Sequence, residues 1–282
     1  MKKLLFVLAF VSVILTFAQP QSDLEGTWVL KSYIDHSDGG KTKMYGNHIL
    51  FQKHIAGCHF TWIKYDTKEK KLIGMGGGTF RVDEAGKYIE NLEFFYPFGS
   101  SELGQSIKFK KTIKGGKWYH TGYVMRMALN DQGELDIVDS LKIEEVWTKV
   151  KTKSGQNDLE GTWILQKARN SPDHEYEEMP NLIGYFKIIT ATHFIWVKYD
   201  AEGDQIYSSG VGTYNLKEDT YIENIQASYP TALEQSVSFS YTREGKMWKH
   251  SGELNTPSGS IYIDELWMPH ICRPTMSGMA HD

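Results

Sequence analysis

The sequence predicts an all-β protein built from two tandem, eight-stranded, antiparallel up-and-down barrels. Most segments alternate between apolar and polar residues with period two and are rich in Trp, Tyr, Phe, Thr, Val and Ile, which is typical of antiparallel strands. The same ordered set of motifs also occurs twice, which indicates one duplicated domain. Eight strands in sequence order can close on themselves, which removes the sheet edges and leaves a narrow interior.

The duplication is clearest in two motifs. The segment from Asp23 to Trp28 returns from Asp158 to Trp163, and His59-Phe-Thr-Trp-Ile-Lys-Tyr-Asp returns at His193 as His-Phe-Ile-Trp-Val-Lys-Tyr-Asp. Further matches follow in the same order, and the differences in length fall between them. In the first copy, strands are expected near residues 26–34, 47–53, 57–66, 76–82, 87–95, 105–113, 117–125 and 141–149.

The glycine-rich stretch at residues 74–78 overlaps the start of the strand predicted at 76–82. It lacks the Lys-Ser/Thr pair and the helix that follow a phosphate-binding loop, and its counterpart in the second copy is the shorter Ser-Gly-Val-Gly at 209–212. We therefore interpret it as a bend in the strand.

The N-terminus has the pattern of a cleaved secretory signal, with Lys2 and Lys3 followed by an apolar run and a small-residue exit that predicts cleavage after Ala18. No later apolar stretch is long enough to cross a bilayer. We therefore expect a secreted or periplasmic protein without a transmembrane segment. The expected organisation is a signal peptide at 1–18, a first barrel at 19–150, a linker at 151–157, a second barrel at 158–270 and a tail at 271–282.

Charge and cysteine content limit the partners. The formal net charge is -4, and removing two signal lysines lowers it to about -6, which argues against a nucleic-acid partner. A run of lysines at residues 108–117 corresponds to Ser238, Ser240 and Tyr241 in the second copy, so we interpret it as a solvated face. Export would permit a disulfide between Cys58 and Cys272, although spacing alone does not place them together.

The head of the first strand resembles a known family. Gly26-Thr27-Trp28 is similar to the Gly-x-Trp of lipocalin-like (calycin) barrels, and the repeat resembles the lipocalin-like domains of secreted, mostly uncharacterised proteins of the Bacteroidetes type. In classical lipocalins a basic residue near the last strand packs over this Trp. The resemblance assigns that role to Lys149 in the first copy and to His270 or Arg273 in the second. It implies a barrel that holds a ligand.

Comparison of the two copies indicates which side chains face inward, because inward residues must fill the same space. Trp118 and His120 recur unchanged, whereas the alternate residues Tyr119 and Thr121 change type. The strand that carries Tyr88 retains residues on both faces, so its orientation stays open. The predicted ligand-binding residues are Phe60, Trp62, Lys64, Tyr88, Glu90, Trp118, His120, Glu145 and Trp147, with Phe194, Trp196, Lys198, Tyr221, Glu223, Trp248, His250, Glu265 and Trp267.

An aromatic interior with a few convergent polar groups is typical of a small-molecule site. The sequence therefore predicts a protein that binds a small amphipathic or hydrophobic ligand. The buried Lys, Glu and His residues could instead satisfy one another as a structural network, or filled barrels could leave function to the outer surface.

The alternative is an enzyme of isomerase, hydratase or lyase type, with a His base, a Glu that orients it and a Lys that stabilises an oxyanion. Its candidate residues are His120, Glu145, Lys64, His250, Glu265 and Lys198.

Three histidines of the first copy, His48, His54 and His59, are close enough in sequence to be candidate metal ligands. His48 and His54 have counterparts that include Leu182 and Ile188, and only His59 recurs. We therefore interpret the three as scattered surface histidines and expect no metal site and no cofactor.

Overall fold

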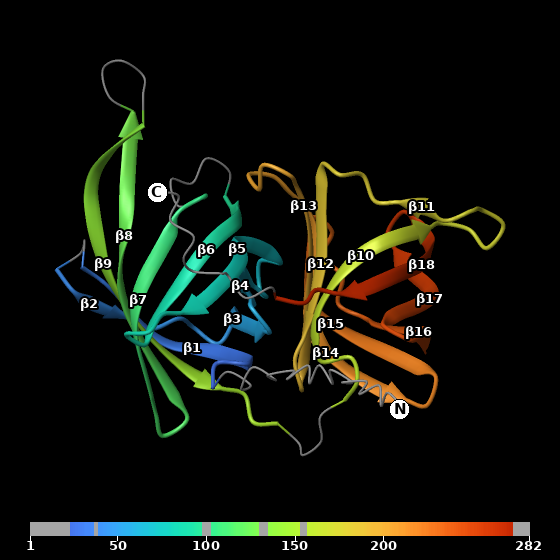
Figure 1. Ribbon diagram of the computed structural model, residues 1–282, viewed down its shortest axis with the longest axis horizontal. Coiled ribbons are helices and arrows are strands. Elements are labelled where there is room, and N and C mark those ends of the chain that lie inside the picture. Colours follow the sequence, from blue (N-terminus) through green and yellow to red (C-terminus); the bar gives the residue numbers. More distant parts are fainter. Residues whose placement is uncertain (1–22, 37–38, 98–102, 130–134, 153–156, 273–282) are drawn as a thin grey trace, which may run out of the picture.

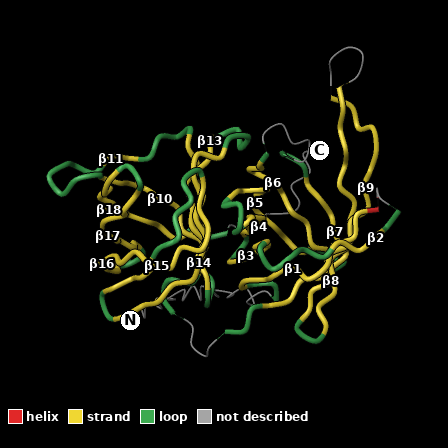
Figure 2. The backbone as a smooth tube through the Cα atoms, turned by 180° about the vertical axis from the view of Figure 1, so that it is seen from behind, coloured by secondary structure: helices red, strands yellow, loops and turns green. Residues whose placement is uncertain are grey.

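The computed structural model describes residues 23–36, 39–97, 103–129, 135–152 and 157–272. Each half of the chain forms an antiparallel sheet that closes into a barrel, and the two barrels lie side by side (Figure 1). The backbone is dominated by strands (Figure 2). The predicted fold class, two tandem eight-stranded barrels, is confirmed.

The first barrel closes where its first long strand pairs with both the third strand and the ninth, and the second barrel closes in the same way. The strands of barrel 1 are β1 (Gly26–Asp35), β2 (Lys41–Lys43), β3 (Ile49–Ala56), β4 (His59–Asp66), β5 (Lys71–Val82), β6 (Lys87–Tyr96), β7 (Ser106–Lys114), β8 (Lys117–Leu129) and β9 (Leu135–Lys149). The strands of barrel 2 are β10 (Gly161–Arg169), β11 (Glu177–Glu178), β12 (Ile183–Ile189), β13 (His193–Asp200), β14 (Ile206–Lys217), β15 (Thr220–Tyr229), β16 (Ser236–Glu244), β17 (Met247–Thr256) and β18 (Gly259–Pro269).

The short strands β2 and β11 are additional to the eight that close each barrel, and the sequence did not predict them. Each pairs with the end of the first long strand, and their side chains are mostly exposed. Without a buried face there is no alternating apolar pattern to reveal a strand. The ribbon of β8 and β9 also extends beyond the predicted limits.

The base of barrel 1 is closed by the Trp of the Gly-Thr-Trp motif. The indole nitrogen of Trp28 donates a hydrogen bond to the carbonyl of Leu24 at 2.7 Å, which fastens the chain entering β1 across the end of the barrel. The ammonium of Lys149 lies 5.4 Å from the centre of the Trp28 ring. The expected basic residue over this Trp is therefore present in barrel 1, as a cation–π contact.

Barrel 2 uses a different residue for the same contact. The guanidinium of Arg243, in β16, lies 4.6 Å from the centre of the Trp163 ring. The expectation that His270 would take this place is wrong, because His270 instead packs against a histidine of barrel 1 at 4.3 Å between ring centres. Arg273, the other expected residue, lies outside the described part of the chain.

Two structural features explain why β5 contains several glycines. The strand has a bulge between Gly77 and Gly78, where Gly78 has a positive φ of 152°, so the expected bend is present. A Cβ on Gly76 would lie 3.0 Å from the indole of Trp62, and one on Gly210 would lie 2.6 Å from Trp196. The glycines thus make room for an indole that lies flat across the neighbouring strand.

The two barrels share a buried apolar interface between the outer faces of their early strands. As a result, β4 and β13 are buried on both faces, and their outward residues pack against the other barrel and not against water. Members of this shared cluster include Ile63, Tyr65, Met75 and Phe94 from barrel 1 and Phe186, Ile195, Val197 and Val211 from barrel 2.

Two hydrogen bonds show that the interface is nearly symmetric. The hydroxyl of Thr27 bonds the hydroxyl of Thr190 at 2.8 Å. With the copies exchanged, the hydroxyl of Thr162 donates to the carbonyl of Ala56 at 3.0 Å. Equivalent positions therefore meet in exchanged order, as they do in a dimer with a two-fold axis.

The interpretation of the histidines as surface residues is wrong for two of the three. His54 and His59 are buried at the interface, and only His48 is exposed. Burial, followed by the nearby His193, holds the pKa of His54 well below its usual value. Burial also lowers the pKa of His59 to about 4, with a smaller contribution from His270, and that of His193 to about 4. These interface histidines are neutral at pH 7.

A disulfide between Cys58 and Cys272 joins the turn after β3 to the chain that follows β18. It fastens the end of barrel 2 to barrel 1. The predicted signal peptide and cleavage site, most of the tail after Cys272 and part of the linker lie outside the described residues. Within the described part of the chain, no helix has the length and apolar character that a bilayer crossing requires.

Candidate functional site

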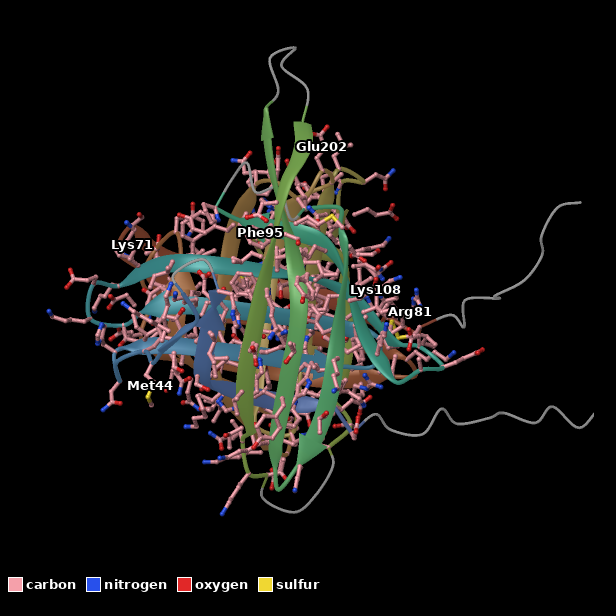
Figure 3. All side chains as sticks on the ribbon, turned by 90° about the vertical axis from the view of Figure 1, so that its left-hand side faces the viewer. Met44, Lys71, Arg81, Phe95, Lys108 and Glu202 are labelled. Atoms are coloured by element: carbon pink, nitrogen blue, oxygen red, sulfur yellow. A yellow bond between two sulfur atoms is a disulfide. The ribbon has the colours of Figure 1, made fainter. Side chains whose placement is uncertain are left out.

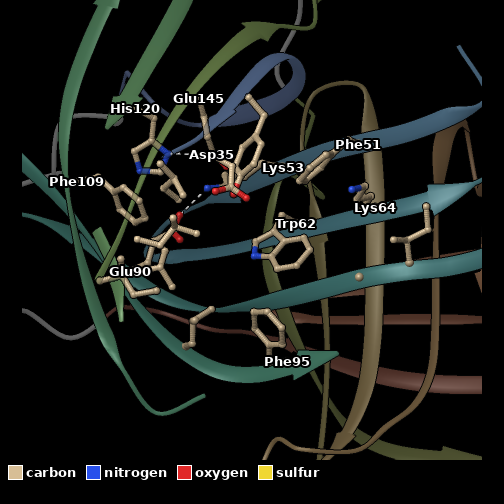
Figure 4. Close-up of a pocket in the computed structure, with 18 of the residues that line it drawn as sticks. Asp35, Phe51, Lys53, Trp62, Lys64, Glu90, Phe95, Phe109, His120 and Glu145 are labelled. Atoms are coloured by element: carbon tan, nitrogen blue, oxygen red, sulfur yellow. Dashed lines mark hydrogen bonds and ion pairs between the residues drawn. The ribbon is translucent and has the colours of Figure 1, made fainter. Parts of the chain in front are cut away.

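Barrel 1 contains an open cavity of about 480 Å³ around the C-terminal end of β1 (Figure 4). This volume is in the usual range for small-molecule sites. The wall is largely aromatic, and its polar groups lie at the floor and around the mouth. Its lining includes Tyr33, Asp35, Lys43, Tyr45, Phe51, Lys53, Trp62, Lys64, Glu90, Leu92, Phe95, Ile107, Phe109, His120, Val124, Met125, Leu141, Glu145 and Trp147.

A buried ion pair forms one part of the floor. The ammonium of Lys53 lies 2.6 Å from a carboxylate oxygen of Glu90, and both side chains are almost completely buried. The same ammonium lies 5.2 Å from the ring centres of both Trp118 and Trp147. The positive charge is therefore balanced by one carboxylate and further stabilised by aromatic faces.

A second polar pair lies beside it. Nδ1 of His120 and a carboxylate oxygen of Glu145 are 2.9 Å apart, and the indole nitrogen of Trp147 donates to the same oxygen at 2.9 Å. Burial, and next the charge of Lys53, lower the pKa of His120 against the opposing effect of Glu145. Burial would raise the pKa of Glu145, but the bond from His120 and the charge of Lys53 outweigh it, so this pKa is lowered.

These shifts define the protonation states at pH 7. Glu145 is ionised and His120 is neutral, so the Nδ1–H of His120 donates to the carboxylate. The other ring nitrogen, Nε2, is buried and has no hydrogen-bond partner among the described residues. It is therefore a free acceptor on a ring that Glu145 holds in place.

Barrel 2 repeats this arrangement. Lys187 and Glu223 form a buried ion pair at 2.8 Å, and a ring nitrogen of His250 lies 2.6 Å from Glu265. The indole nitrogen of Trp267 donates to Glu265 at 3.1 Å. Both interiors therefore contain the same four polar groups with the same partners.

The structure brings only some of the predicted ligand-binding residues to the cavity of barrel 1. Those that line it are Trp62, Lys64, Glu90, His120, Glu145 and Trp147. Those packed in the buried core outside the lining are Phe60, Tyr88 and Trp118. In barrel 2, the predicted residues packed in the buried core are Phe194, Tyr221, Trp248 and Trp267. Those in the polar network are Glu223, His250 and Glu265. Those that are half-buried are Trp196 and Lys198.

Lys64 lies apart from the polar network to which the sequence had assigned it. Its ammonium lies 4.0 Å from the centre of the Tyr45 ring and 5.7 Å from that of Phe51, at the side of the cavity away from His120 (Figure 4). No described carboxylate forms an ion pair with it. This cation is therefore available to a ligand at the mouth.

Lys53 was missed by the sequence analysis, although a signal was present. It recurs as Lys187, whereas both of its chain neighbours differ between the copies. Identity on one face and change on the other is the same sign that placed His120 inside the barrel. The network needs this lysine because Glu90 would otherwise be an unpaired buried charge.

Two groups of side chains in the described part of the chain are close enough to reach one metal ion. One consists of Cys58, His59 and Cys272, and the other of Asp200 and its neighbours Glu202 and Asp204. The cysteines of the first are joined in the disulfide, and the acids of the second lie at the end of β13 and in the turn that follows it. Neither group lines the cavity of barrel 1.

Comparison with known families gives one match. A family model described as "Domain of unknown function (DUF4488)" matches residues 158–273, which correspond to barrel 2. A search of curated proteins finds no significant match to the chain.

The solved structures that match over most of the chain share little sequence with it. A protein of unknown function from the DUF3598 family of Nostoc punctiforme has 11% identity and a TM-score of 0.24, covering 88% of this chain and 96% of that one. A transferrin binding protein B mutant from Haemophilus parasuis has 8% identity and a TM-score of 0.28, covering 89% and 77%. TM-scores this low carry no functional argument.

Proposed function

We propose that this chain is an exported, lipocalin-like binding protein whose first barrel holds a small amphipathic molecule. The observation that carries the proposal is the open aromatic cavity of about 480 Å³, which has an unpaired ammonium at its mouth. Such a cavity can bury an apolar body while one cation fixes a polar end. The signal peptide predicted at residues 1–18 supports export.

The charges favour a ligand with an anionic head group. At the floor, Lys53 and Glu90 neutralise each other, and Glu145 already accepts bonds from His120 and Trp147. Among the described lining residues, Lys64 is the cation without an ion pair, and its ammonium lies near the rings of Tyr45 and Phe51. The apolar body of the ligand would therefore pack against the aromatic wall, with its anionic head at Lys64.

The first test is to look for a bound molecule and then for the role of the lysine. Native mass spectrometry of the protein from its own host should show an additional mass that is lost on denaturation. With the anionic amphiphile 1-anilinonaphthalene-8-sulfonate as a probe, Lys64→Met should weaken binding about tenfold or more, because a hydrogen bond to a charged group contributes roughly 1.5–3 kcal/mol.

Lys198→Met is the matched control, because it removes the corresponding lysine of barrel 2. It should leave binding to barrel 1 unchanged. Equal binding by wild type and Lys64→Met, or no binding of the probe, would exclude the proposed site.

One observation favours an enzyme as the second candidate. His120 is neutral, is oriented by Glu145 and lines the open cavity, which are the requirements for a general base. Wild-type protein incubated with small-molecule extracts of the host should then deplete a compound that His120→Gln does not deplete. Binding without depletion would leave the carrier function alone.

A further inference from the structure

The outer wall of barrel 1 carries a group of four cations that we name the basic face: Arg81 on β5, Lys87 on β6, and Lys108 and Lys110 on β7. All four side chains are exposed. In the sheet register Arg81 and Lys108 flank the same residue of β6, and both side chains lie on the same side of the barrel (Figure 3). The four positions thus form one continuous patch across three neighbouring strands.

Barrel 2 has the same wall without these charges. By register, the corresponding residues are Asn215, Thr220, Ser238 and Ser240. They occupy strands of the same pairing and the same order. Neutral polar residues at these four positions are therefore sufficient for the barrel to close and for its outer wall to be solvated.

The charges also carry a cost in barrel 1. Lys87 lies directly opposite Lys110 on the adjacent strand, and like charges in that position destabilise a sheet. None of the four basic residues forms an ion pair with a carboxylate in the described part of the chain. They are concentrated here although the whole chain has a net charge of -4. A solvated face alone does not account for this concentration.

We propose that the basic face docks barrel 1 on a surface of anionic lipid headgroups. The cations are spread over a wall and do not converge on a pocket, so they fit a charged surface better than a single small anion. On the neighbouring strand β8, Tyr123 is 59% exposed and Tyr119 is 41% exposed. Tyr side chains favour the boundary between water and lipid.

Barrel 2 lacks these flanking tyrosines as well. By register, Tyr119 corresponds to Lys249 and Tyr123 corresponds to Glu253. The carboxylate of Glu253 would be repelled by an anionic surface. At these positions the four basic residues and the two exposed tyrosines therefore occur together in barrel 1 and are all replaced in barrel 2. This docking surface is separate from the cavity, so it does not depend on the proposed ligand.

The test is cosedimentation of the signal-free protein with vesicles of phosphatidylcholine that contain 30% phosphatidylglycerol, compared with phosphatidylcholine alone. Binding is expected only to the anionic vesicles and should weaken as salt is raised. The variant Lys108→Ser/Lys110→Ser introduces the residues that barrel 2 carries. It should bind roughly thirty-fold more weakly, given the contribution of each Lys near an anionic surface.

The matched control is Lys217→Ser/Lys246→Ser, which removes the same charge from exposed positions of barrel 2. It should change binding by less than about three-fold, because charges beyond a Debye length of the surface are screened. Equal losses in both variants would attribute binding to net charge and overturn the proposal. So would equal binding to neutral vesicles, or binding to an acidic polysaccharide such as heparin without binding to anionic vesicles.

Discussion

The two barrels have the same interior and different outer surfaces. In both, a buried Lys–Glu pair lies beside a His–Glu pair that receives an indole hydrogen bond. The four positions of the basic face carry cations in barrel 1 and neutral polar residues in barrel 2. The mouth also differs, because Tyr33 and Phe95 in barrel 1 correspond by register to Ala168 and Ser228 in barrel 2.

This contrast separates structural residues from candidates for specificity. The Lys–Glu and His–Glu pairs that both copies retain have their partners within the barrel, so the charges of the floor are balanced without a ligand. The differences at Tyr33, Phe95 and the basic face lie at the mouth and on the outer wall, where a ligand or a surface would meet the protein. The duplication therefore indicates that the floor supports the barrel, and in our proposals the mouth and the wall would select the partner.

The largest expected effect comes from removing one partner of a buried ion pair. Lys53→Ala and Lys187→Ala should each lower the free energy of unfolding by about 3–5 kcal/mol, because each leaves a buried carboxylate without its counter-charge. Denaturant unfolding monitored by tryptophan fluorescence measures the change. Similar losses in the two barrels would support one shared structural role.

The control for this experiment removes both charges. Lys53→Met/Glu90→Leu should recover much of the stability, since a well-packed apolar pair can replace a buried ion pair. A much larger loss in barrel 1 than in barrel 2 would break the comparison. It would show that the two networks are not equivalent.

The sequence could predict the features that comparison of the two copies reveals. It predicts that Trp118 and His120 face inward, because the second copy retains both residues while the residues on the alternate face change. It could not predict the interface between the barrels, because contact between the two copies leaves no pattern that the comparison can detect. The sequence therefore predicts surface positions for His54 and His59, although the other barrel covers them. Cavity size depends on side-chain packing that periodicity does not contain.

The next largest effect on stability should come from lowering the pH, because the interface between the barrels contains buried neutral histidines. The pKa of His59 and that of His193 fall from 6.5 to about 4 on folding. Below pH 6.5 the unfolded chain binds protons that the folded protein excludes, so stability is complete above pH 6.5 and is lost as the pH falls toward 4. Each residue should contribute roughly 3 kcal/mol to this loss.

Urea unfolding between pH 7 and pH 4.5 would measure this dependence. His59→Gln should reduce the slope of stability against pH, because it removes one group that must stay neutral in the interface. His48→Gln is the matched control, since His48 is exposed. A slope that is the same in wild type and His59→Gln would contradict burial of His59 between the barrels.

A smaller effect is expected where each barrel accommodates an indole against a glycine. Gly76→Ala and Gly210→Ala place a Cβ 3.0 Å from Trp62 and 2.6 Å from Trp196. Overpacking of this kind costs about 1–3 kcal/mol, and the closer contact should make Gly210→Ala the more harmful. Thermal unfolding of the two variants would test the order. The reverse order would show that the indole of Trp196 can move aside more easily than that of Trp62.

The smallest difference concerns the cations over the first tryptophans. Lys149 lies 5.4 Å from the Trp28 ring, and Arg243 lies 4.6 Å from the Trp163 ring. Lys149→Met should cost about 0.5–1 kcal/mol, the usual range for a partly exposed cation–π contact, and Arg243→Met should cost somewhat more because its contact is shorter.

Thermal unfolding at low and high salt would separate charge from packing in these two variants. Methionine keeps much of the apolar stem, so a loss that remains unchanged by salt would be due to packing and not to charge. Equal stability of wild type and both variants would mean that the two basic residues only cover the indoles. In that case Lys149 and Arg243, which come from different strands, would be independent solutions to closing the base of a barrel.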